Sequence, residues 1–101
     1  MLNMEFVKEE NVLNVSLEGR LDTNTTPEAT QKIEENMENV TELVLDFEKL
    51  EYISSAGLRL LLSLQKNMNA TEGVMRILHV NETIKEIFDV SGFIDILTVE
   101  E

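Results

Sequence analysis

The order in which strand-like and helix-like patterns follow one another most constrains the fold of this chain. Residues 4–7 and 12–17 are two strand candidates joined by a polar turn, because apolar and polar side chains alternate in the second segment. Single helical and single strand patterns then alternate to the end of the chain. The order β-β-α-β-α-β-α-β predicts an α/β fold: a mixed sheet with parallel βαβ crossovers, an N-terminal antiparallel hairpin and helices packed on the sheet. We expect one domain over residues 1–101.

Two threonines mark the start of the first helix. We expect the second strand to end at Gly19 and a loop to follow it. Thr26 as the N-cap places Pro27 at the first helical position, where its missing N–H costs nothing. Thr25 as the N-cap instead gives a capping box with Glu28. Both alternatives start a helix at this point.

Short apolar runs and cap residues predict the remaining helices and strands. An apolar run interrupted only by Asp46 is typical of a strand buried on both faces. The next apolar segment is rich in leucine and has no β-branched residue, which favours a helix. Asn81 and Gly92 have the positions of an N-cap and a C′ residue around a third helix. The expected elements are a strand at 43–47, a helix from 58 with its core face at Leu58, Leu61, Leu62 and Met68, a strand at 74–80, a helix at 82–90, and a final strand or terminal extension at 94–99.

The charge of the chain excludes several classes of partner. Eight basic and 20 acidic residues give a formal net charge of -12. A phosphate backbone would be repelled, so the composition argues against nucleic-acid binding, and an anionic membrane surface is disfavoured for the same reason. The apolar runs are too short to span a bilayer, and the N-terminus lacks the pattern of a signal peptide. We therefore expect a cytoplasmic protein without direct membrane insertion.

The inventory of reactive side chains argues against an enzyme. The chain has no cysteine and one histidine, His79, which we interpret as a solvated turn residue. No glycine stands two residues before Ser54 or Ser55, as a nucleophile elbow requires. Asp46 is either a structural cap or a site residue. Calcium-loop and glycine-rich phosphate-binding motifs are both missing, so we expect no catalytic residue, no cofactor and no metal.

Two adjacent serines, Ser54 and Ser55, stand where the second helical pattern begins. One serine here can serve as the helix N-cap. One helix cap needs only one serine, so the second serine is not explained by capping. A helix N-terminus also offers unpaired N–H groups and the positive end of the helix dipole, so a phosphoryl group on serine is tolerated there.

Four segments of the chain, in order and at matching spacing, resemble the STAS domain of the anti-sigma factor antagonist family. The resemblance covers essentially the whole chain, and its most specific part surrounds the two serines. The segments are LEGRLD at residues 17–22, LVLDF at 43–47 with Leu50, Tyr52 and Ile53 after it, ISSAGL at 53–58, and VSGF at 90–93.

The resemblance implies a phosphorylation-controlled partner switch. Ser55 occupies the place of the family's phosphorylated serine, with Ser54 as a minor alternative acceptor. Ser54 stands where aspartate is common in the family, and Ala56 stands where a second hydroxyl is common. The unphosphorylated protein would bind an anti-sigma factor that is also a GHKL-type serine kinase, and so free a sigma factor. A PP2C-type phosphatase would reset the switch. The alternative is a structural STAS subunit of a stress-sensing or lipid-transport complex that does not use Ser55.

We expect the partner to bind around the start of the second helix. Helical geometry places Arg59 one turn from Ser55, and it projects Leu60 away from the core stripe as an apolar contact. Asp22 should border the same end if the crossovers are right-handed. In the alternative interpretation, Arg59 only offsets local acidity and Leu60 is partly buried. The predicted partner-binding residues are Asp22, Ser54, Ser55, Gly57, Leu58, Arg59 and Leu60.

Overall fold

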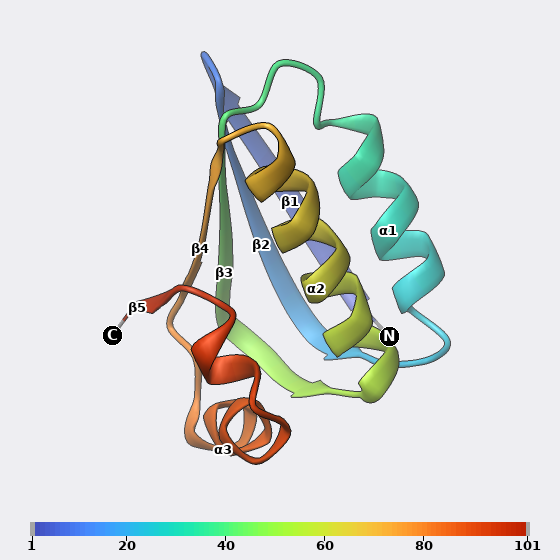
Figure 1. The fold of residues 1–101 in the computed structure, drawn as a ribbon. Coiled ribbons are helices and arrows are strands. Elements are labelled where there is room, and N and C mark those ends of the chain that lie inside the picture. Colours follow the sequence, from blue (N-terminus) through green and yellow to red (C-terminus); the bar gives the residue numbers. More distant parts are fainter. Residues whose placement is uncertain (1, 101) are drawn as a thin grey trace.

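A five-stranded sheet organises the fold, and its strands lie side by side in the order in which they occur along the chain (Figure 1). The computed structural model describes residues 2–100. β1 and β2 form an antiparallel hairpin, and each later strand is parallel to the one before it. The predicted mixed sheet is therefore confirmed. The elements are β1 Leu2–Glu9, β2 Val12–Leu21, α1 Thr26–Glu35, β3 Glu42–Ile53, α2 Ser55–Ala70, β4 Val74–Leu78, α3 Glu82–Ser91, a 3-10 turn at Phe93–Asp95, and β5 Val99–Glu100.

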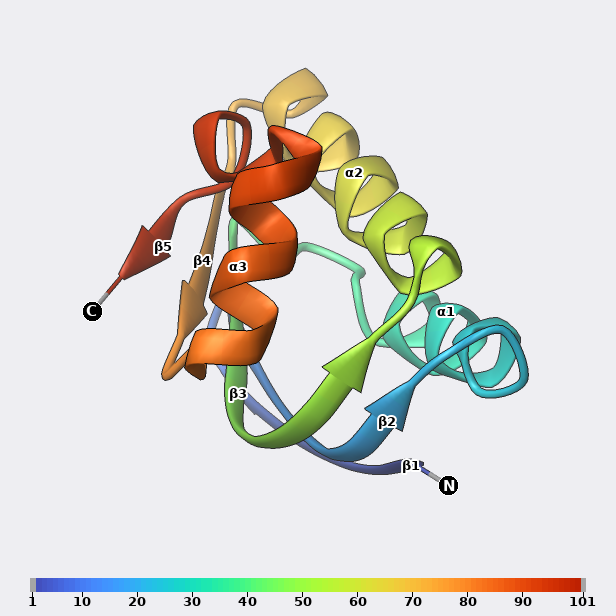
Figure 2. The ribbon, with the colours of Figure 1, turned by 90° about the horizontal axis from the view of Figure 1, so that it is seen from below.

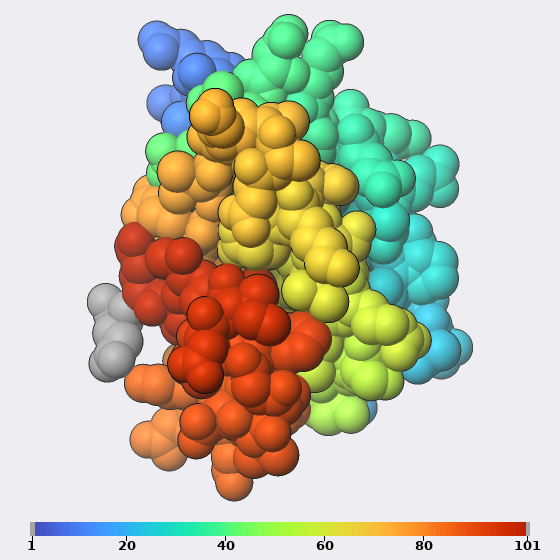
Figure 3. Space-filling view, viewed as in Figure 1, coloured from blue at the N-terminus to red at the C-terminus, as the bar shows by residue number. Residues whose placement is uncertain are grey.

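All three helices pack on the same face of the sheet (Figures 1 and 2). The crossovers from β2 to β3, β3 to β4 and β4 to β5 advance in one direction, and crossovers of one hand then place their helices on one side. In the space-filling view, α1, α2 and α3 form most of the surface over this face (Figure 3). Within the part of the chain that the structure describes, no helix covers the opposite face.

Side-chain alternation along the strands divides the sheet into a core face and a solvent face. Leu13, Val15 and Leu17 of β2 are buried toward the helices, whereas Ser16 and Glu18 between and after them are exposed. Strand β3 alternates less strictly, because Val44 is also buried and the register against β2 shifts twice. Its buried residues include Leu43, Leu45, Phe47, Leu50 and Ile53.

The predicted end of the second strand at Gly19 is wrong, because β2 continues to Leu21. The register of β2 against β3 shifts twice, once between Ser16 and Glu18 and once between Gly19 and Arg20. Each shift leaves one extra residue on β3, as in a β-bulge. Gly19 has a φ of 110° beside the second shift, so the glycine bends the strand without ending it.

The helix boundaries follow the predicted cap residues in position. Thr25 precedes α1, but it forms no side-chain cap hydrogen bond, so the predicted capping box is not formed. Asn81 caps α3, since its Oδ1 accepts a hydrogen bond from Ile84 N at 2.8 Å. Gly92 follows α3 with a φ of 81°, as a left-handed C-cap requires. The final strand is shorter than predicted, because Phe93–Asp95 forms a 3-10 turn. No described helix is long and apolar enough to cross a membrane.

Candidate functional site

The ends of β2 and β3 bring the predicted site residues to one end of the sheet. Leu21 and Ile53 are paired neighbours in the parallel ladder, and Ser54 N donates a hydrogen bond to Leu21 O at 2.9 Å. The loop that begins at Asp22 and the serines that begin α2 therefore leave the sheet side by side. Figure 2 shows the start of α2 next to the end of β2.

Ser54 and Ser55 differ in the environment of their side chains. Ser55 is the first residue of α2 and is exposed. Ser54 has the N-cap position with extended backbone angles, but its side chain forms no cap hydrogen bond. The Ser54 Oγ atom is buried and has no hydrogen-bond partner among the described residues. An exposed hydroxyl and a buried one thus stand next to each other.

The first turn of α2 can accept negative charge. Its N-cap side chain does not occupy the free backbone N–H groups, and the turn contains no acidic residue. The first turns of α1 and α3, in contrast, contain Glu28 and Glu82. The dipole and the free N–H groups of α2 therefore favour an anion on Ser55, with no carboxylate in the same turn to oppose it.

Gly57 lets α2 pack directly on the strand ends. A Cβ atom at this position would lie 2.6 Å from Ile53 Cγ1 and 3.0 Å from both Leu21 Cγ and Leu21 O. The helix can approach this closely only because residue 57 has no side chain. Leu58 is also buried, at 9% exposure. Gly57 and Leu58 therefore lie between the site and the sheet and do not form the surface of the site.

The expectation that Leu60 projects away from the core is wrong, since Leu60 is only 6% exposed. Helix α2 contacts α1 as well as β3 and β4, so it buries a wider stripe than one line of leucines. Leu62, expected in the core face, is instead half-buried. Arg59 is exposed on the same helix.

Asp22 organises the loop between β2 and α1. Its Oδ1 accepts hydrogen bonds from Asn24 N at 3.0 Å and Thr25 N at 3.1 Å, and its own N–H donates to Thr25 Oγ1 at 2.9 Å. The Thr25 hydroxyl donates in turn to Arg20 O at 2.8 Å. The hydrogen bond from Thr25 N, followed by that from Asn24 N, lowers the pKa of Asp22 against the opposing effect of burial. Asp22 thus has a structural role, and its role in partner binding stays a prediction.

Arg20 and Tyr52 form a stacked pair on the solvent face beside the loop. They are cross-strand neighbours, and Arg20 Cζ lies 4.4 Å from the centre of the Tyr52 ring. Arg20 Nε is also 3.8 Å from Asp22 Oδ2. Sequence reasoning assigned neither residue to the site, because it placed Arg20 in a loop. Extending both predicted strands and aligning them in parallel would have placed Arg20 opposite Tyr52.

The arrangement defines a class: a small α/β domain that presents a serine at a helix start beside a rigid loop. Solved structures share this fold. The anti-sigma factor antagonist SpoIIAA in its unphosphorylated form aligns with a TM-score of 0.76 at 20% identity, over 100% of this chain and 88% of that chain. An anti-sigma factor antagonist from Mycobacterium paratuberculosis aligns with a TM-score of 0.88 at 19% identity, over 98% and 85%.

Sequence comparison identifies the family. The STAS domain model matches residues 3–101, so the chain belongs to the STAS domain family. The anti-sigma-B factor antagonist of Staphylococcus epidermidis is 29% identical over 101 residues, which cover 99% of this chain and 94% of that protein. BtrV of Bordetella bronchiseptica is 39% identical over 57 residues, which cover 56% of this chain and 49% of BtrV. The resemblance expected from the sequence is confirmed.

Proposed function

We propose that this protein is an anti-sigma factor antagonist that acts by binding rather than by catalysis. In its unphosphorylated form it binds an anti-sigma factor and so frees a sigma factor. The anti-sigma factor is also a GHKL-type serine kinase, which phosphorylates Ser55 and thereby ends the complex. A PP2C-type phosphatase removes the phosphate. This function places the protein in the cytoplasm, where sigma factors act.

The exposed hydroxyl of Ser55 at the uncapped start of α2 is the observation that carries the proposal. A kinase can reach this oxygen without opening the fold, whereas the Ser54 Oγ is buried. The names of relatives support the same function. A protein 29% identical over nearly the whole chain is named an anti-sigma-B factor antagonist. SpoIIAA, which shares the fold, has been solved in both unphosphorylated and phosphorylated forms.

Phosphorylation acts on the partner interface in this proposal, not on the stability of the domain. A phosphoserine adds about -1.5 to -2 charges at pH 7. At Ser55 this charge faces the positive end of α2, and the domain tolerates it. A bound partner must instead desolvate the charge or place its own carboxylates against it. The interface that we propose lies around Asp22, Ser55 and Arg59, with Gly57 and Leu58 beneath it.

Mass spectrometry after incubation with ATP and candidate anti-sigma kinases from the same genome tests the proposal. We expect one phosphoryl group on the wild type and on Ser54→Ala, and none on Ser55→Ala. Binding of the unphosphorylated protein to the same kinase should be measured in parallel. Full labelling of Ser55→Ala would assign the phosphate to another residue, and a wild type that neither binds nor is labelled by any such kinase would refute the proposed function.

A further inference from the structure

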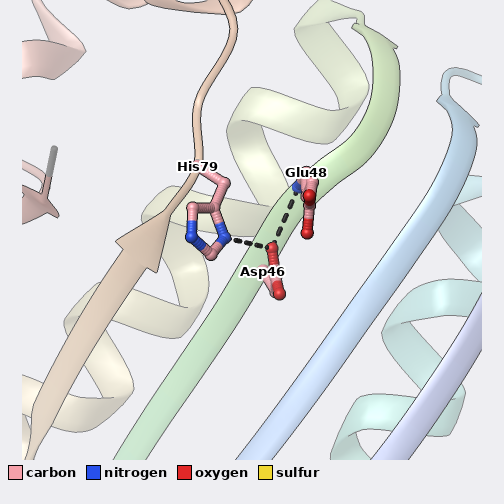
Figure 4. A group of neighbouring side chains, drawn as sticks. All are labelled: Asp46, Glu48 and His79. Carbon is pink, nitrogen blue, oxygen red and sulfur yellow. Dashed lines mark hydrogen bonds and ion pairs between the residues drawn. The ribbon is translucent and has the colours of Figure 1, made fainter.

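Three metal-ligating side chains meet on the solvent face of the sheet, away from the start of α2. Asp46 lies in β3, Glu48 is two residues further along, and His79 directly follows β4. Asp46 is paired with Leu78, so the parallel register brings His79 beside the two carboxylates. One ligand atom of each side chain lies within 4.8 Å of the other two. Figure 4 shows the imidazole directed toward Asp46, with Glu48 beside it.

Local backbone structure brings these three side chains together. Residues two apart on a strand share a face, so Asp46 and Glu48 point to the same side of β3. The first register shift between β2 and β3 falls just beyond Asp46, where the ladder passes from the Ser16–Asp46 pair to the Glu18–Lys49 pair. His79 has a φ of 59°, a left-handed conformation that turns the chain at the end of β4. No described helix covers this face, so the cluster is open to solvent.

We propose that Asp46, Glu48 and His79 form a binding site for a divalent cation of the Zn²⁺ class. One imidazole nitrogen and two carboxylate oxygens are ligands that Zn²⁺ accepts at about 2.0–2.2 Å, and the imidazole favours late first-row metals over Mg²⁺ or Ca²⁺. Two ligands two apart on one strand and a third on the next strand leave one side of the ion free. Water completes the coordination there.

A cavity adjoins the two carboxylates of the proposed site, although His79 does not line it. Asp46 and Glu48 line a cavity of about 210 Å³ on the same face of the sheet. The other lining side chains include two carboxylates, one amide and one hydroxyl, but only one ammonium group. The charge around the cavity therefore favours a cation. The residues that complete the lining are Asn3, Glu5, Ser16, Leu17, Glu18 and Lys49.

A simple ion pair accounts for only two of the three side chains. His79 Nδ1 lies 2.9 Å from Asp46 Oδ1, and this contact raises the pKa of His79. Burial opposes the charge of Asp46, but hydrogen bonds from His79 and from Glu48 N lower its pKa. The Glu48 carboxylate forms no hydrogen bond with that pair and acts on it only through its charge, which also raises the pKa of His79. A metal site requires the Glu48 carboxylate, whereas an ion pair does not, and this difference separates the two explanations.

Titration of the full-length protein with zinc chloride, followed by calorimetry in a non-chelating buffer at about pH 8, tests the site. The variants are Glu48→Gln, Asp46→Asn and His79→Asn. Asparagine at residue 46 keeps an acceptor for Glu48 N, and asparagine at residue 79 tolerates the left-handed backbone. The exposed α1 residue Glu34 provides the matched control variant Glu34→Gln. Because the chain has one histidine, its imidazole NMR signal reports binding without ambiguity.

We expect one equivalent of Zn²⁺ to bind the wild type and Glu34→Gln and to shift the His79 signal. Each ligand variant should bind about tenfold more weakly or not at all. Absence of saturable binding, or equal binding by Glu48→Gln and wild type, would overturn the proposal. Circular dichroism and thermal melts of each variant exclude loss of fold as the cause. The result is independent of whether Ser55 is phosphorylated, so either proposal can fail without the other.

Discussion

Replacing Gly57 by alanine tests whether α2 depends on direct contact with the strand ends. Helix propensity alone predicts that Gly57→Ala stabilises the protein by about 1 kcal/mol. The structure predicts the opposite sign. The new methyl group would lie 2.6 Å from Ile53 Cγ1, which is closer than real Cβ contacts, and 3.0 Å from Leu21 O, which is tighter than most of them.

The size of the effect follows from what surrounds the new atom. Ile53 and Leu21 are at most 1% exposed, so neither side chain can move into solvent. Leu21 O is held by the hydrogen bond from Ser54 N, and shifting α2 would strain that bond. Overpacking of this kind costs about 1–3 kcal/mol, and because neither side chain can move into solvent we expect the upper half of that range, about 2–3 kcal/mol. After the gain in propensity is subtracted, we expect a net loss of about 1–2 kcal/mol in the free energy of unfolding.

Urea unfolding at 25 °C, with thermal melting in parallel, measures this loss. For a domain of this size we expect the melting temperature to fall by about 5–15 °C. Ser63→Ala is the matched control, because Ser63 is an exposed residue of the same helix and gains propensity without a clash. If Gly57→Ala is as stable as the wild type or more stable, while Ser63→Ala behaves as expected, the close packing inferred for the start of α2 is wrong.

Further predictions concern three residues of the site, Ser55, Arg59 and Asp22. Ser55→Asp should leave the melting temperature nearly unchanged, since a negative charge at a helix N-terminus contributes about 0.3–1 kcal/mol, yet it should abolish kinase binding in calorimetry. Arg59→Glu should weaken kinase binding at unchanged stability, and unaltered affinity would remove Arg59 from the interface. The lowered pKa of Asp22 means that its stabilisation is present above its ordinary pKa and is lost as the pH falls through the lowered value. Asp22→Asn should therefore flatten the acid side of the stability curve, as urea midpoints at falling pH will show, and Asp22→Ala should weaken both folding and kinase binding.

The topology could be predicted from the sequence because it depends on strong, local signals. A hairpin followed by alternating helices and strands leaves few right-handed arrangements, and the observed sheet is the simplest of them. The position of Ser55 at a helix start was likewise visible in the change of pattern after Ile53. Both inferences needed only neighbours in sequence.

Features that depend on contacts between distant residues were missed. The burial of Leu60 reflects the packing of α2 against α1 as well as the sheet, which one helical stripe does not reveal. Gly19 marks the bend in β2, but whether the strand ends or continues there depends on the extra residues in β3. Asp46 and His79 come together only through the register of β3 and β4. The sequence shows that both residues follow or end strands, but it does not show that their side chains are in contact.

The sequential order of the strands has a consequence for how the domain assembles during synthesis. Each strand pairs with the one made just before it, so every new strand finds its edge already present as the chain leaves the ribosome. Each parallel pairing has to wait for a whole helical crossover, which slows it, but the N-terminal strands are made first and can pair first. The nearest neighbours of the missing Gly57 side chain are atoms of Leu21 and Ile53. The contact between the start of α2 and the ends of β2 and β3 can therefore form before α3 and β5 have been translated.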